Sequence, residues 1–163
     1  MTMSDDKGRQ RSHAPRRYFT DAEQARVLAS IQAAEARTSG EIRLHVERDL
    51  PKRGPAAGDA YARAREVFAR LGMDRTAEHN GVLVYLALKP RALAIVGDEG
   101  LHARVGEAFW RAVVAAMIAA FADDRPAEGI AAGVALIGER LREHYPHRAD
   151  DVNELPDDIS FAP

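Results

Sequence analysis

Residues 80–96 decide the fold, and they have the sequence NGVLVYLALKPRALAIV. An Asn-Gly turn precedes an uninterrupted apolar run, residues 82–88, which is typical of a strand buried on both faces. Lys89-Pro90-Arg91 then makes a short connection to a second apolar run, residues 92–96. This spacing predicts an antiparallel hairpin whose first strand lies in the middle of a sheet.

A further strand is predicted upstream, over Glu41–Glu47, because apolar and polar residues alternate strictly along it. One face of this strand is therefore buried and the other is polar, a pattern typical of an edge strand with His45 exposed. Apolar residues at helical spacing predict a helix over residues 59–71 between this strand and the hairpin. Since a strand–helix–strand crossover normally joins parallel strands, we expect the strands that begin at Glu41 and Gly81 to be parallel.

The remaining pattern is helical. Thr20-Asp21-Ala22-Glu23 is a capping box and starts a helix that ends near Gly40. After Gly100 we expect a short helix over residues 101–105, a longer one along residues 109–121, and a last one that starts at Pro126. The predicted fold class is α/β, with a small mixed sheet of three to four strands flanked by helices on both faces.

The chain has 163 residues, which fits one domain. We expect residues 1–16 to be a disordered tail, residues 17–146 to be the α/β domain, and residues 147–163 to be an acidic extension. Apolar residues in that extension (Leu155, Ile159 and Phe161) indicate that part of it docks on the domain.

Composition limits the function. The formal net charge is -2, without the basic excess of a nucleic-acid-binding domain. The chain has no cysteine, which excludes disulfides, thiolate metal sites and cysteine nucleophiles. No stretch has the pattern of a signal peptide or the length of a membrane span, so we expect a cytoplasmic protein without membrane insertion.

Polar groups are expected to gather at one end of the sheet. The parallel strands start at Glu41 and next to Asn80, and the returning strand finishes at Asp98 and Glu99. Carboxylate and amide oxygens are the ligands that hard cations prefer. We predict a metal site from these residues, with two further ligands from the acidic extension and with His79 as a neighbour; the predicted ligands are Glu41, Asn80, Asp98, Glu99, Asp150 and Asp151.

Another interpretation of these residues stays open. Asn-Gly and Gly-Asp-Glu-Gly are also ordinary turn sequences, which need no ligand. The sequence contains no nucleophile elbow, phosphate-binding loop or dinucleotide fingerprint, so no catalytic residue and no organic cofactor is predicted. Arg43 and Arg104 are the candidates for binding a phosphate.

Several motifs resemble those of the TPM domain family. They are Thr38–Ile42, Asn80–Ala87, Ala94–Gly100, Gly129–Gly133 and Asp150–Pro156, and the resemblance covers about residues 18–161. It implies a small sheet between helices, and it implies divalent-cation binding, mainly of Ca²⁺ and otherwise of Mg²⁺. It also implies a phosphatase activity, known from plant members. Many members carry an export signal and a membrane anchor, and we expect this chain to lack both.

Three functions follow. The first is a divalent-cation-binding domain, with calcium as the expected ion. The second is a metal-assisted phosphatase acting on phosphomonoesters. The third is an ion-free module that binds an unknown protein partner through its acidic extension.

Overall fold

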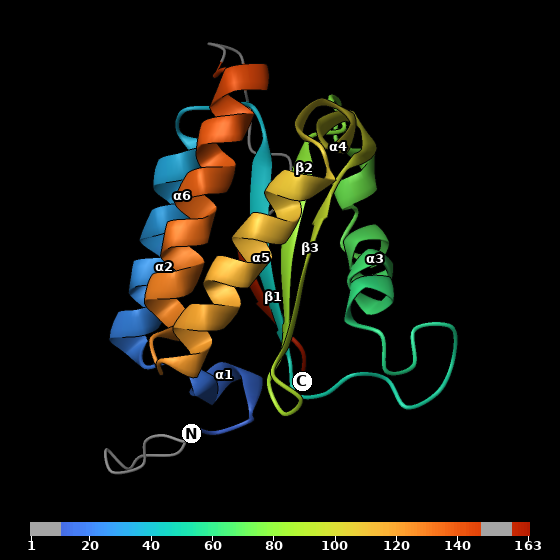
Figure 1. Cartoon of the computed structure of the whole chain (residues 1–163), viewed down its shortest axis with the longest axis vertical. Coiled ribbons are helices and arrows are strands. Elements are labelled where there is room, and N and C mark those ends of the chain that lie inside the picture. Colours follow the sequence, from blue (N-terminus) through green and yellow to red (C-terminus); the bar gives the residue numbers. More distant parts are fainter. Residues whose placement is uncertain (1–10, 148–157) are drawn as a thin grey trace.

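The computed structural model describes residues 11–147 and 158–163, which contain a four-stranded sheet in the order β3-β2-β1-β4 (Figure 1). The strands are β1 (Glu41–Glu47), β2 (Gly81–Ala87), β3 (Ala92–Gly97) and β4 (Ile159–Phe161). β1 is parallel to both β2 and β4, and β2 is antiparallel to β3. The predicted mixed sheet, the parallel crossover and the hairpin are therefore confirmed.

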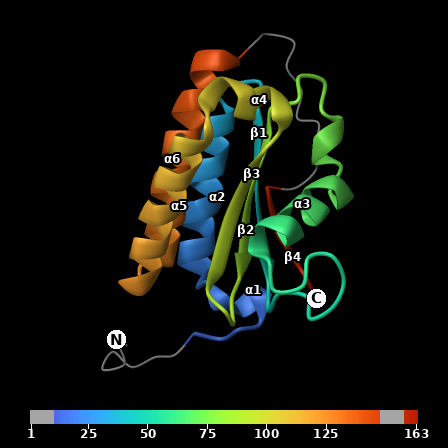
Figure 2. The ribbon, with the colours of Figure 1, turned by 45° about the vertical axis from the view of Figure 1, so that its right-hand side comes forward.

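Helices cover both faces of the sheet (Figures 1 and 2). One face carries three helices, and the other carries α3 (Ala60–Arg70) with the 3₁₀ helix η2 (Met73–Arg75). The three helices are α2 (Asp21–Glu35), α5 (Glu107–Ala122) and α6 (Pro126–His144). Two short helices, α1 (Pro15–Tyr18) and α4 (Glu99–Val105), precede α2 and α5. The capping box predicted at Thr20 is present, with both of its hydrogen bonds to Glu23.

β2 is the centre of the core, because all seven of its residues are buried. Val82, Val84 and Leu86 belong to the core cluster under α2, α5 and α6. Leu83 and Tyr85 belong to the cluster under α3. Full burial of a large apolar side chain stabilises a fold by about 1.5–3 kcal/mol, so this strand holds both helical layers to the sheet.

The prediction that β1 is an edge strand is wrong. β4 pairs with its outer side through Leu44–Ile159, His45–Ser160 and Val46–Phe161, so β1 lies inside the sheet. His45, expected to be exposed, is only 6% exposed. The alternation of apolar and polar residues along a strand identifies its polar face, but it does not show whether other elements pack against that face. Here residues of α3 and of the distant strand β4 contact the polar side chains of β1.

A buried polar network makes this arrangement possible. The Glu47 carboxylate accepts hydrogen bonds from Arg63 Nε (3.0 Å) and Nη2 (2.6 Å), and from the Tyr85 hydroxyl (2.5 Å). His45 lies beside it, with Nε2 at 3.6 Å from Glu47 Oε1, and its Nδ1 shares a 2.6 Å hydrogen bond with Ser160 Oγ. The network therefore connects α3, the two central strands and β4.

The network also determines the charge state of Glu47. Burial alone would raise the pKa of the Glu47 carboxyl, but hydrogen bonds from His45, Arg63 and Tyr85 outweigh that effect. The pKa of Glu47 is held well below its usual value as a result. Burial raises the pKa of the Tyr85 hydroxyl above its usual range, and its hydrogen bond to Glu47 adds to the shift.

Glu35 supports β1 at a point that β4 is too short to reach. The pairing of β4 begins opposite Leu44, and the N–H of Ile42 donates instead to Glu35 Oε2 at 2.8 Å. Burial raises the pKa of Glu35 to about 8, and the carboxyl groups of Asp158 and Glu41 add to the shift. Glu35 is thus largely protonated at neutral pH, which reduces the repulsion among these three carboxyl groups.

The segment ahead of α1 contacts two other parts of the domain. Residues 11–16 belong to the described structure, whereas residues 1–10 lie outside it. Arg11 donates to both oxygens of Glu23 (2.7 and 2.8 Å) and to Asp124 (2.9 Å). This ion-pair group connects the chain before α1 to the start of α2 and to the loop before α6.

Among the described residues, no single helix has the length and apolar character needed to cross a membrane. The pair α4 and α5 meets that test by length and composition, and it is bent by 95°.

Replacing Glu47 by Gln should lower the free energy of unfolding by about 2 kcal/mol, because the charge that Arg63 and Tyr85 bind would be lost inside the protein. The pKa of Glu47 is depressed on folding, so its stabilisation is present above the ordinary Glu pKa of about 4.3 and is lost as the pH falls below it. Urea unfolding of both proteins from neutral to acid pH tests this. Glu139→Gln, which removes a surface pair with Arg142, is the control and should change little.

Glu35→Gln should give the opposite pH dependence. Because folding raises the pKa of Glu35 to about 8, its contribution is most favourable below the ordinary value of about 4.3 and is lost as the pH rises toward 8. The wild type should therefore lose stability relative to Glu35→Gln between weakly acid and weakly alkaline pH. Equal slopes for the two proteins in urea unfolding would contradict this electrostatic role.

Candidate functional site

Three segments meet at one end of the sheet, as the topology predicts. Glu41 at the start of β1 pairs with Gly81 at the start of β2. The N–H of Asp98, just after β3, donates to the carbonyl oxygen of Gly81 at 2.9 Å. The Asn80 amide donates to Ser39 Oγ at 3.2 Å, which closes the gap between the first two segments.

Three side chains at this end could share a metal ion. Ligand atoms of His79, Asp98 and Glu99 all lie within 4.8 Å of one another. His79 Nδ1 is 3.5 Å from Asp98 Oδ2. His79 and Glu99 are exposed whereas Asp98 is buried, so the group has a buried inner side and an open outer side.

The carboxylate of Asp98 is only partly hydrogen-bonded. Its Oδ1 accepts from the N–H of Glu99 at 2.8 Å and caps α4. Its Oδ2 is buried and has no hydrogen-bond partner among the residues that the structure describes. A buried carboxylate oxygen in this state costs free energy unless a cation compensates it.

A shallow open depression of about 770 Å³ adjoins the trio. Its cationic group is Arg104, whose guanidinium carbon lies 5.2 Å from the centre of the Tyr145 ring. The depression is therefore lined by both signs of charge; its lining residues are Glu78, His79, Glu99, Gly100, Ala103, Arg104 and Tyr145.

Gly100 allows α4 to approach the loop before β2. A Cβ at this position would lie 2.8 Å from the carbonyl oxygen of His79 and 3.3 Å from that of Glu78. His79 itself has a φ of 52°, a left-handed conformation that is uncommon outside glycine and concentrates at functional sites.

The other predicted ligands lie in different surroundings. Glu41 is buried and is not part of the trio, and its charge acts on Glu35 instead. Asn80 is buried beside the trio, with its amide directed to Ser39. Asp150 and Asp151 lie outside the described residues.

The sequence predicts His79 as a neighbour of the site, and in the structure its ring nitrogen lies within 4.8 Å of ligand atoms of Asp98 and Glu99. Its position immediately before Asn80 was the available signal. Tyr145 and Glu78 were missed as lining residues, because their approach depends on how α6 ends and how the loop before β2 turns.

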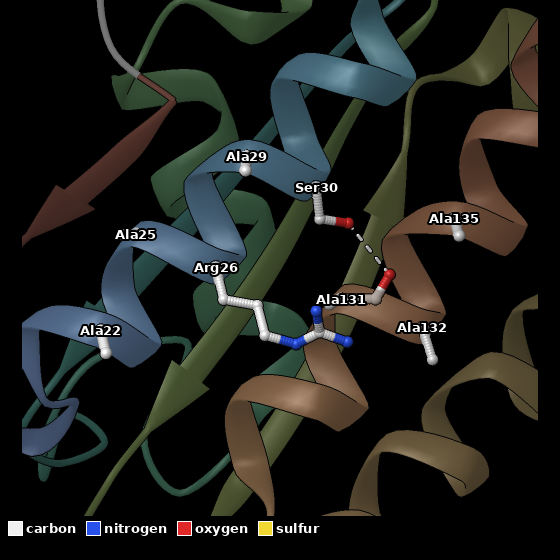
Figure 3. Close-up of a pocket in the computed structure, with 8 residues that line it drawn as sticks. All are labelled: Ala22, Ala25, Arg26, Ala29, Ser30, Ala131, Ala132 and Ala135. Carbon is white, nitrogen blue, oxygen red and sulfur yellow. Dashed lines mark hydrogen bonds between the residues drawn. The ribbon is translucent and has the colours of Figure 1, made fainter.

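Another groove, of about 620 Å³, lies between α2 and α6 (Figure 3). Its walls are alanines from both helices, and its one charged side chain is Arg26. Ser30 Oγ donates to the carbonyl oxygen of Ala131 at 3.0 Å and is thereby occupied. No set of acidic or basic groups converges there, so we place the candidate site at the sheet end instead.

Comparisons with known proteins agree with this fold. The TPM domain matches residues 14–140. The BA42 protein of the psychrophilic bacterium Bizionia argentinensis, solved by NMR, has a similar structure with a TM-score of 0.78 and 33% sequence identity. The similarity covers 89% of this chain and 96% of BA42.

A second solved structure, the N-terminal domain of a P. gingivalis protein, has a TM-score of 0.62 and 18% identity, with 80% of this chain and 82% of that domain covered. At this identity it supports the fold alone. No curated protein matches. Since the family match spans most of the chain and BA42 is similar over nearly its whole length, this chain belongs to the TPM domain family.

Proposed function

We propose that this TPM domain binds a divalent cation, with Ca²⁺ as the expected ion and Mg²⁺ as the alternative, at the end of the sheet where Asp98 and Glu99 meet. The observation that carries the proposal is the buried Asp98 Oδ2, which no described donor satisfies. A cation bound between the two carboxylates would compensate this oxygen at the mouth of an open depression.

The donor set fits a hard cation. Carboxylate oxygens are the preferred ligands of Ca²⁺ and Mg²⁺, and water completes their coordination shells where a site is open. Glu99 is exposed and can turn toward Asp98 without disturbing the core. His79 is the nitrogen donor of the trio, and its imidazole would accept or donate a hydrogen bond to a ligated water, or bind a softer ion directly.

The remaining predicted ligands stay predictions. Glu41 and Asn80 would then act as supporting residues that hold the starts of β1 and β2 together. Asp150 and Asp151 follow His147 in sequence, so they could add ligands from the acidic extension. Location in the cytoplasm likewise stays a prediction.

Calcium should raise the melting temperature of the wild-type protein. A ligand that binds the folded state alone adds about 2.7 kcal/mol of stability at a concentration about 100 times its Kd. Asp98→Asn with Glu99→Gln should abolish the shift, because both carboxylate charges are removed. Thermal unfolding with CaCl₂, and with MgCl₂ in parallel, measures it, while amide NMR during the titration identifies the responding residues.

Glu107→Gln is the matched control, since this carboxylate is exposed at the start of α5 and lies outside the trio. Its calcium response should equal that of the wild type. An unchanged wild-type melting temperature at millimolar Ca²⁺ and Mg²⁺ would overturn the proposal. A response to Zn²⁺ alone that disappears in His79→Ala would contradict an oxygen-based site.

A second candidate is a metal-assisted phosphatase acting on phosphomonoesters, and Arg104 is the observation that favours it. Arg104 lines the same depression as His79 and Glu99, and its side chain is placed over the Tyr145 ring. A guanidinium there could bind phosphate oxygens in a bidentate manner. A bound cation would supply Lewis-acid polarisation of the phosphoryl group.

Arg104→Ala should lower the rate of aryl-phosphate hydrolysis by about a hundredfold, because a charged hydrogen bond to the transferring group would be lost. The calcium-dependent rise in melting temperature should remain. Hydrolysis that is equal in the wild type and in Asp98→Asn would exclude this site as its source. In that case the cation-binding proposal would still be decided by the thermal measurement.

The third candidate, an ion-free module that binds a protein through the acidic extension, rests on residues 147–163, of which residues 148–157 lie outside the described structure. It differs from the first in predicting no calcium response. Deletion of residues 148–157 would then abolish partner binding.

A further inference from the structure

The outer half of α5 is apolar although none of the residues that the structure describes covers it. Between Ala112 and Ala122 its exposed positions hold five alanines and Ile118, which is 47% exposed. The inner half is apolar as well, since Trp110, Val113 and Met117 are buried. A helix on the surface of a globular protein normally has polar residues on its outer face.

The exposed residues of α5 form a seam suited to another helix. Arg111, Ala115, Ile118 and Ala122 follow one another at intervals of four, three and four residues. This spacing keeps side chains on one line along a helix and is the spacing used in helix–helix seams.

We propose that this seam is a self-association surface, on which α5 packs antiparallel against α5 of a second copy. A two-fold axis between Ala115 and Ile118 would place Ile118 of each copy opposite Ala115 of the other copy. Such a contact is the same on both copies and closes as a dimer. The inference concerns a face of the molecule separate from the cation site and does not depend on it.

Charge favours a second copy in this orientation. Arg111 lies near the beginning of α5, and Asp123 lies directly after its end. In the antiparallel arrangement each Arg111 faces the last turn of the other helix, where the negative end of the helix dipole and Asp123 lie. A parallel arrangement would place Arg111 against Arg111. In the described part of the chain, neither Arg111 nor Asp123 has an ion-pair partner.

A lipid surface fits the seam less well. Amphipathic helices that lie on membranes have a basic polar face opposite their apolar one. On α5 the opposite face is buried against the sheet and α6, and Arg111 is the one basic residue of the helix. The seam is also rich in alanine, which favours close approach of a second helix over deep insertion into lipid.

Sedimentation equilibrium of the full chain, from low micromolar to millimolar concentration, tests the proposal. We expect a concentration-dependent dimer. Ala115→Glu should weaken dimerisation at least about tenfold, because its carboxylate would be unpaired in an apolar contact. Ala33→Glu on the exposed side of α2 is the matched control and should dimerise like the wild type.

Orientation can be tested separately, because the chain has no cysteine of its own. A mixture of Ala115→Cys and Ile118→Cys proteins should form a disulfide-linked heterodimer. Ala122→Cys alone should not cross-link, since two such residues would lie about 16 Å apart along antiparallel helices. Arg111→Glu and Asp123→Arg should each weaken dimerisation, and the double variant should restore it.

A wild-type chain that stays monomeric over the whole concentration range would overturn the proposal, as would Ala115→Glu dimerising like the wild type. Efficient cross-linking of Ala122→Cys with itself would overturn the antiparallel orientation. Binding of the monomer to vesicles of anionic phospholipid, lost in Ile118→Glu, would assign the seam to a lipid surface instead. Circular dichroism spectra of each variant confirm that it is folded.

Discussion

The parallel pairing of β1 with β2 is the constraint on which the rest of the structure depends. It aligns Glu41 with Gly81 and places the starts of both strands at one end of the sheet. Because β3 returns antiparallel from β2, its final residues reach the same end. The trio of His79, Asp98 and Glu99 therefore results from strand direction: the pairing determines which loops meet, and the loops then supply the polar groups.

Much of this fold could be predicted from the sequence because its signals are local. The apolar run of β2, the alternation of β1 and the capping box at Thr20 each lie within a few residues. The position of β1 inside the sheet was not accessible in this way. It depends on β4, which follows more than a hundred residues later, and three residues of strand carry too little pattern to be recognised.

The candidate site could be predicted from the sequence to about the same extent as the fold. Strand direction alone predicted that the segments around Asn80 and Asp98 meet. His79 belongs to the trio and Glu41 does not, and both facts depend on the direction of the side chain. The direction of His79 follows from its left-handed backbone conformation, and that of Glu41 follows from the face of β1 on which it lies. Neither property can be determined from residue type or spacing.

Three carboxyl groups in or beside the sheet differ in how a charge away from water is compensated. Glu47 is paired with Arg63 and hydrogen-bonded by Tyr85, so it stays ionised. Glu35 has carboxyl neighbours in place of a cation, and it retains its proton.

Among the described residues, no arginine pairs with Asp98 as Arg63 pairs with Glu47. Its Oδ1 is satisfied by the backbone of Glu99, and the nearest cationic candidate for Oδ2 is an exposed histidine at 3.5 Å. Burial is costly for a charge without a partner, and the other two carboxyl groups have their compensation built into the fold. Of the three, Asp98 is therefore the one for which the described part of the chain supplies no compensation, and its place at the edge of an open depression is why we propose the cation site there.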